Sequence, residues 1–134
     1  MDDIVLEPYI FFKGNCREAM EFYKSVFGGE LRVTTYKDAG VSANGTNPDW
    51  LMHASLEGGA VKLMGSDTAQ ASPRAMKVTL SLGGKDETRM RRIFDALSAD
   101  GDVISPLKKE AWGDLFGSFT DKYGVEWMMN IGSS

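Results

Sequence analysis

Hydrophobic and polar positions run through the same order of elements twice along the chain. Apolar or alternating stretches predict four strands in the first half, at residues 8–13, 31–35, 51–56 and 60–64. They predict four more in the second half, at residues 77–82, 103–105, 112–120 and 125–131. Apolar residues at helical spacing predict one helix in each half, between its first and second strands. Each half therefore predicts the order strand–helix–strand–strand–strand.

Local signals predict where these elements end. Asn15 followed by Glu18 predicts a capping box at the start of the first helix, and Gly28-Gly29 predicts its end. Gly83-Gly84 and Pro106 each predict the end of a strand. Stretches rich in turn-forming residues predict a loop at 38–50 and a linker at 65–73.

The joints between elements repeat as well. Residues 27–31 and 99–103 both pass from a helix through glycine and an acidic residue into an apolar strand. This similarity indicates a duplicated module, with copies at about 8–65 and 77–131 inside one domain, 1–134. We expect an α+β fold in which two βαβββ modules form a curved mixed sheet with helices on its convex side. Its concave side would be a cup-shaped cavity, the usual form of a small-molecule site.

Composition narrows the class of protein. The chain has 134 residues, a net charge of −4 and a single cysteine, Cys16, which excludes an internal disulfide framework. An acidic domain without a basic stripe is a poor nucleic-acid binder, and no apolar run is long enough for a membrane span. The N-terminus, Met1-Asp2-Asp3, is acidic where a signal peptide would be basic. We expect a cytoplasmic protein with no nucleic-acid or membrane partner.

Several phrases resemble a known family. Residues 11–29 are similar to the first strand and helix of the vicinal oxygen chelate superfamily, above all of its PhnB-like, glyoxalase/bleomycin-resistance group. Residues 52–56 resemble that group's third strand, and residues 107–117 and 120–127 resemble its C-terminal signature. The resemblance implies paired βαβββ modules around a cup, and a homodimer. Some similar proteins carry a ubiquinone-pathway methyltransferase label, but we find no glycine-rich strand-to-helix loop for S-adenosylmethionine.

The metal ligands of this superfamily are histidines and glutamates on the first and last strands of each module. At the matching positions this chain has Pro8 and Tyr9 on the first strand, Leu63 between Lys62 and Met64 on the fourth, residues 77–79 on the fifth, and Met128 with Glu126 nearby on the last. The only histidine is His53, so a set of two histidines and two glutamates cannot form. We therefore expect no metal and no cofactor.

Candidate site residues lie on the predicted strands. His53 and Glu126 are the candidate catalytic residues, either as a general base or as a partial metal site; each has a plain structural alternative, as a hydrogen-bonded strand residue or a solvated one. The residues expected to bind a ligand are Tyr9, Phe11, His53, Trp112, Phe116 and Trp127. Cys16 at the start of the first helix is a reactive thiol or, more simply, a buried residue.

Two functions remain open. The first is a binding protein of the bleomycin-resistance kind, which holds a small, partly apolar molecule without the family's full metal site. The second is a metal-dependent lyase, isomerase or dioxygenase of the glyoxalase kind, with a reduced or altered metal site around His53 and Glu126.

Overall fold

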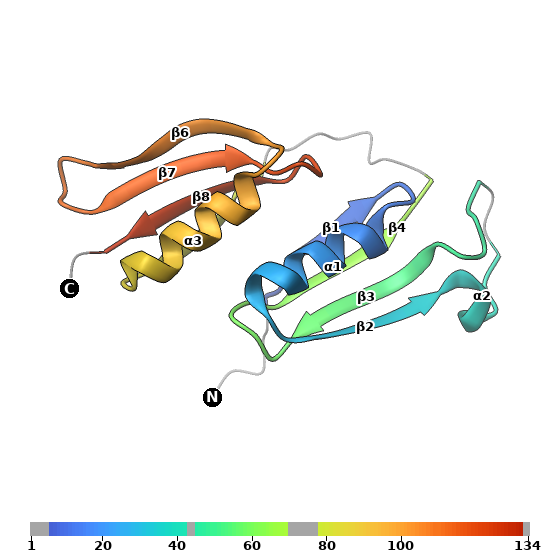
Figure 1. Ribbon diagram of the computed structural model, residues 1–134. Coiled ribbons are helices and arrows are strands. Elements are labelled where there is room, and N and C mark those ends of the chain that lie inside the picture. Colours follow the sequence, from blue (N-terminus) through green and yellow to red (C-terminus); the bar gives the residue numbers. More distant parts are fainter. Residues whose placement is uncertain (1–5, 43–44, 70–77, 133–134) are drawn as a thin grey trace. The chain divides into compact units, whose positions relative to one another are not determined.

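The computed structural model describes residues 6–42, 45–69 and 78–132. The chain divides into two compact units, which we call unit 1 (Met1–Pro73) and unit 2 (Arg74–Ser134) (Figure 1). No helix among the described residues is long and apolar enough to cross a membrane.

Unit 1 is a four-stranded mixed sheet with one long helix. Its elements are β1 (Tyr9–Phe12), α1 (Cys16–Phe27), β2 (Glu30–Thr35), the short α2 (Tyr36–Ala39), β3 (Leu51–Glu57) and β4 (Leu63–Asp67). The strand order is β1-β4-β3-β2. β1 runs parallel to β4, and the other neighbours are antiparallel.

Unit 2 repeats this topology. Its elements are β5 (Leu80–Gly84), α3 (Glu87–Ser98), β6 (Asp102–Lys109), β7 (Leu115–Thr120) and β8 (Glu126–Ile131). The strand order is β5-β8-β7-β6, again with one parallel pair, β5 and β8. The predicted α+β class and the order strand–helix–strand–strand–strand are confirmed in both units. The cup-shaped cavity stays a prediction.

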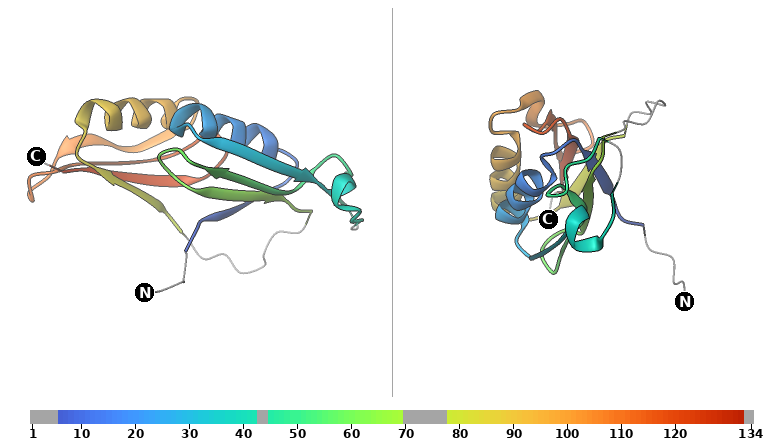
Figure 2. Two further views of the ribbon diagram at one scale, coloured as in Figure 1. Left: turned by 90° about the horizontal axis from the view of Figure 1, so that it is seen from below. Right: turned by 90° about the vertical axis from the view of Figure 1, so that its right-hand side faces the viewer.

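Each long helix covers one face of the sheet in its own unit (Figure 2). In unit 1, a Cβ atom on Gly65 would lie 3.1 Å from the Cys16 Sγ atom of α1, so Gly65 faces the helix. Its neighbours Met64 and Ser66 therefore point to the other face, together with their β1 partners Tyr9 and Phe11. In unit 2, Gly117 faces the Phe94 ring of α3 in the same way.

Several predicted boundaries were wrong for identifiable reasons. The strand predicted at 60–64 is β4 at 63–67, so the first residues of the predicted linker are strand. Gly83 and Gly84 are the last two residues of β5 and do not interrupt it, and the missing side chain of Gly84 leaves room for Met90. β6 continues through Pro106 because it is an edge strand and its pairing shifts on both sides of Ser105.

Other boundaries also shift. The predicted strand at 112–120 begins at Leu115, and α2 occupies the start of the predicted loop at 38–50. Residues 43–44, 70–73 and 77, which belong to the predicted loop, linker and fifth strand, lie outside the described residues. The acidic N-terminus, Met1-Asp2-Asp3, also lies outside the described residues.

The predicted capping box at Asn15 is also wrong, because the Asn15 side chain makes no capping hydrogen bond. Instead, the carboxylate of Asp67, at the end of β4, accepts hydrogen bonds from backbone N–H groups at the start of α1. Its Oδ1 atom accepts hydrogen bonds from the backbone N–H groups of Gly14 (2.8 Å) and Cys16 (3.0 Å), and its Oδ2 atom accepts one from Leu51 N–H (3.0 Å). Asp67 is 1% exposed. This buried carboxylate thus links the end of β4 to the loop before α1, to the first residue of α1 and to the first residue of β3.

Candidate ligand-binding face

The face of the unit 1 sheet opposite α1 carries an aromatic pair. We call this surface, formed by Tyr9, Phe11, His53, Met64 and Ser66, the open face of unit 1. The Tyr9 and Phe11 rings stack with centroids 5.1 Å apart and an interplanar angle of 27°. Tyr9 is 39% exposed and Phe11 65% exposed. The expectation that Tyr9 and Phe11 share the strand face away from the helix is confirmed.

His53 joins this pair from β3, across the intervening strand β4. The hydroxyl oxygen of Tyr9 lies 3.0 Å from His53 Nδ1, and the two ring centroids are 5.7 Å apart. His53 is half-buried, and strand alternation places it on the same face as Ser55, the pairing partner of Met64. The fold thus brings His53, which lies 44 residues from Tyr9 in the sequence, beside Tyr9 and Phe11, two further predicted site residues.

The environment of Tyr9 keeps its hydroxyl group protonated. Partial burial raises the pKa of Tyr9 above its ordinary value, and this effect outweighs a hydrogen bond with the Ser66 side chain, which lowers the pKa. A neutral phenol can both donate and accept a hydrogen bond. The open face therefore combines aromatic surface, which suits a planar ligand, with polar atoms that can orient it.

The corresponding face of unit 2 holds a second group of predicted residues. The Trp112 and Phe116 rings meet edge to face, with centroids 6.1 Å apart. Trp112 Nε1–H donates to Asn130 Oδ1 (3.3 Å), and the Asn130 amide donates to Asp114 (2.9 Å). Trp112 is 62% exposed and lies in the turn before β7. Sequence reasoning did not single out Asn130, because a lone asparagine on a strand carries no recognisable pattern.

The two remaining predicted residues of unit 2 lie on opposite faces of β8. Glu126 is half-buried and accepts a hydrogen bond from the Thr79 hydroxyl at 2.8 Å. Trp127 is 1% exposed and points with its pairing partner Phe119 toward α3. Trp127 is thus a core residue, which corrects its assignment to a ligand-binding surface. A shared site of His53 and Glu126 stays a prediction, because His53 belongs to unit 1 and Glu126 to unit 2.

Cys16 is an inert core residue. Its side chain is fully buried. Burial, helped by the neighbouring Asp67 carboxylate, raises the pKa of the Cys16 thiol to about 12. The structure therefore favours the simpler of the two predicted roles, because the effect of the helix N-terminus on the thiol does not prevail.

Two measurements check the state of Cys16. In the native protein at neutral pH, we expect the thiol to react with a disulfide reagent only as fast as the chain unfolds, and to react at once in urea. Because the folded pKa lies above the usual value near 9, the thiol's contribution to stability is complete below pH 9. It should then fall by about 1.4 kcal/mol per pH unit toward pH 12, and Cys16→Ala should remove this component. Rapid labelling of the native protein would contradict the assignment.

Side chains that could bind a metal do not cluster among the described residues. In the part of the chain that the structure describes, no three side chains of His, Cys, Asp or Glu gather closely enough to hold a metal ion. The expectation of a metal-free protein stays a prediction, which elemental analysis can test.

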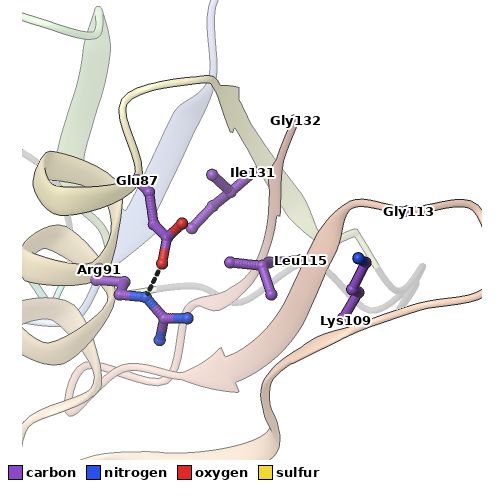
Figure 3. Close-up of a pocket in the computed structure, with 7 residues that line it drawn as sticks. All are labelled: Glu87, Arg91, Lys109, Gly113, Leu115, Ile131 and Gly132. Atoms are coloured by element: carbon purple, nitrogen blue, oxygen red, sulfur yellow. Dashed lines mark hydrogen bonds and ion pairs between the residues drawn. The ribbon is translucent and has the colours of Figure 1, made fainter. Parts of the chain in front are cut away.

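A separate pocket lies on the α3 side of unit 2 (Figure 3). It has a volume of about 250 Å³. An ion pair between Arg91 Nε and Glu87 Oε2 (2.8 Å) forms one wall, and Lys109, Leu115 and Ile131 lie opposite. None of the predicted site residues lines it. Its rim mixes both signs of charge, so it points to no particular ligand.

Two units of βαβββ topology, each with its long helix on one face of its own sheet, define the class of glyoxalase/bleomycin resistance/dioxygenase folds. Solved structures so titled, from Burkholderia phytofirmans and Frankia, share this fold at 12% and 13% sequence identity. More specifically, the chain belongs to the family described as 3-demethylubiquinone-9 3-methyltransferase, whose model matches residues 5–130. The resemblance to the PhnB-like group is confirmed.

Individual relatives cover nearly the whole chain. Protein YjdN of Escherichia coli is 30% identical over 138 residues, which cover 94% of each chain. The crystal structure of protein PA1353 from Pseudomonas aeruginosa is 35% identical, has a TM-score of 0.86 and matches 98% of this chain and 100% of its own. A structure from Bacillus cereus, titled a putative 3-demethylubiquinone-9 3-methyltransferase, PhnB protein, is 24% identical with a TM-score of 0.77. It matches 96% of this chain and 100% of its own, and at this identity it supports the fold alone.

Proposed function

We propose that the chain binds a small, partly apolar molecule on the open face of unit 1, without the full metal site of the superfamily. The observation that carries the proposal is the stacked Tyr9–Phe11 pair, exposed beside the hydrogen-bonded His53. On the other face of β1, Phe12 is buried and Ile10 half-buried, whereas Phe11 is 65% exposed. Exposed aromatic surface beside fixed polar groups is characteristic of a recognition site.

The amides at the start of α1 do not favour the methyl transfer in the family's description. A carboxylate such as that of the methionine part of S-adenosylmethionine can bind at a strand-to-helix turn only where backbone N–H groups are free. Here Gly14 N–H and Cys16 N–H already donate to the Asp67 carboxylate. We therefore propose ligand sequestration of the bleomycin-resistance kind, in a homodimer whose mass light scattering can check against the 14.7 kDa chain. About one equivalent of divalent metal per chain in elemental analysis would favour the metal-dependent alternative instead.

The binding site can be tested with 2-naphthol, a neutral planar probe, by isothermal titration calorimetry. We expect Phe11→Ala to weaken binding about 10-fold, since a stacked ring contributes about 1–2 kcal/mol through lost contact area. Ile104→Ala is the matched control, because Ile104 is an apolar strand residue of unit 2 with a similar exposed fraction, 58%. Equal effects of the two substitutions, or no binding by the unaltered protein, would overturn the proposed site.

A further inference from the structure

The two ring nitrogens of His53 have different surroundings. Nδ1 lies 3.0 Å from the Tyr9 hydroxyl oxygen. Nε2 makes no hydrogen bond with any residue that the structure describes. A neutral imidazole carries its proton on one nitrogen only, and the hydrogen bond at the other nitrogen decides which. The contact with Tyr9 therefore determines what His53 offers to a ligand.

Either group can donate this hydrogen bond, depending on which ring nitrogen of His53 carries the proton. A phenol keeps its proton at neutral pH and donates it to a bare imidazole nitrogen, which is a good acceptor. Burial raises the pKa of Tyr9 above the ordinary value, so the phenol keeps the proton that it can donate. If the Tyr9 O–H group donates to Nδ1, then the proton of the neutral ring lies on Nε2.

We propose that Tyr9 holds His53 in the Nε2–H form, so that the open face presents an N–H donor beside the Tyr9–Phe11 pair and selects planar ligands with an acceptor oxygen, such as a carboxylate. Tyr9 is then a positioning residue as well as a stacking surface. The inference rests on the proposed function and names the ligand class for that same face.

The proposed form also bears on the metal-dependent alternative. An imidazole that binds a metal does so through its unprotonated nitrogen, and it usually donates its other N–H group to a neighbour. With Tyr9 as donor, the bare nitrogen is Nδ1, which the phenol already occupies. Binding of a metal at Nε2 would require the opposite form, in which His53 Nδ1–H donates to Tyr9.

Nitrogen NMR of protein labelled with ¹⁵N-histidine reads this form directly, because His53 is the only histidine. The spectrum is recorded at alkaline pH, where imidazole rings are neutral. We expect a protonated Nε2 and an unprotonated Nδ1. Tyr9→Phe should move both resonances toward a mixture of forms, and Tyr123→Phe, in unit 2, should move neither. A proton on Nδ1, or no change in Tyr9→Phe, would overturn the inference.

Two probes with the same ring and opposite head groups test the ligand class: 2-naphthoate and 2-naphthylmethylammonium. We expect 2-naphthoate to bind at least 10-fold more tightly, and Tyr9→Phe, which keeps an aromatic ring, to reduce this preference several-fold. Equal binding of both probes would overturn the acceptor preference and leave the proposed function standing. Binding of neither would overturn the ligand class together with the proposed function, while the NMR result decides the form of His53 independently.

Discussion

Replacing Asp67 with alanine is expected to lower the free energy of unfolding by about 4 kcal/mol. The carboxylate accepts three backbone hydrogen bonds, from Gly14, Cys16 and Leu51. Hydrogen bonds to a charged group contribute about 1.5–3 kcal/mol each, and a buried N–H group without a partner costs about 1–3 kcal/mol. Because Asp67 is only 1% exposed, water cannot readily replace the lost carboxylate oxygen atoms.

Urea unfolding followed by circular dichroism measures this loss. Asp67→Asn should cost about 2 kcal/mol, because its amide oxygen can keep part of the acceptor function while its NH₂ group faces an N–H donor. Asp95→Ala is the control: Asp95 is an exposed aspartate on α3, so its replacement should change stability by less than about 0.5 kcal/mol. If Asp67→Ala does not fold, Asp67→Asn carries the test. A cost below about 1 kcal/mol for both variants would show that the three hydrogen bonds to the carboxylate do not stabilise the fold.

Asp67 shows what the sequence pattern could not supply. The pattern located the two long helices and the sequential order strand–helix–strand–strand–strand in each unit, because apolar spacing is a local property. It also placed Tyr9 and Phe11 on the face away from α1, since the opposite face of β1 must receive the helix. The partners of Asp67 are 16 to 53 residues away along the chain. In the sequence, Gly65-Ser66-Asp67 has the composition of a linker, and no local rule marks it as the end of a strand.

β8 shows the complementary difficulty. Trp127, Met128, Met129 and Ile131 give this strand apolar residues on both faces. Strict alternation is the signal that distinguishes a core face from an open one, and it is missing here. The sequence therefore could not tell that Trp127 faces α3 and Met128 the other side. Only the pairing of Trp127 with Phe119, which contacts Phe94 of α3, settles the face.

Trp127→Ala is expected to lower the free energy of unfolding by about 4 kcal/mol, as is typical of a large aromatic residue removed from a core. The loss has two physical parts. One is the cavity left between β8 and α3. The other is the hydrogen bond that Trp127 Nε1–H donates to Asp121 Oδ2 at 2.9 Å. Asp121 keeps its bonds from Tyr123 N–H and Val125 N–H, so the turn that they form should persist.

Two further variants separate these parts and test the assignment of faces. Trp127→Phe keeps an aromatic ring in the core and removes the indole N–H group, so it should cost about 2 kcal/mol in urea unfolding. Met128→Ala is the matched control, because Met128 is the half-buried neighbour on the opposite face and should cost about 1 kcal/mol. If Met128→Ala destabilised the protein as much as Trp127→Ala, the core would not lie on the α3 side of β8. A large loss confined to Trp127 would confirm that the core of unit 2 lies on the α3 side of β8, with Glu126 and Met128 on the other face.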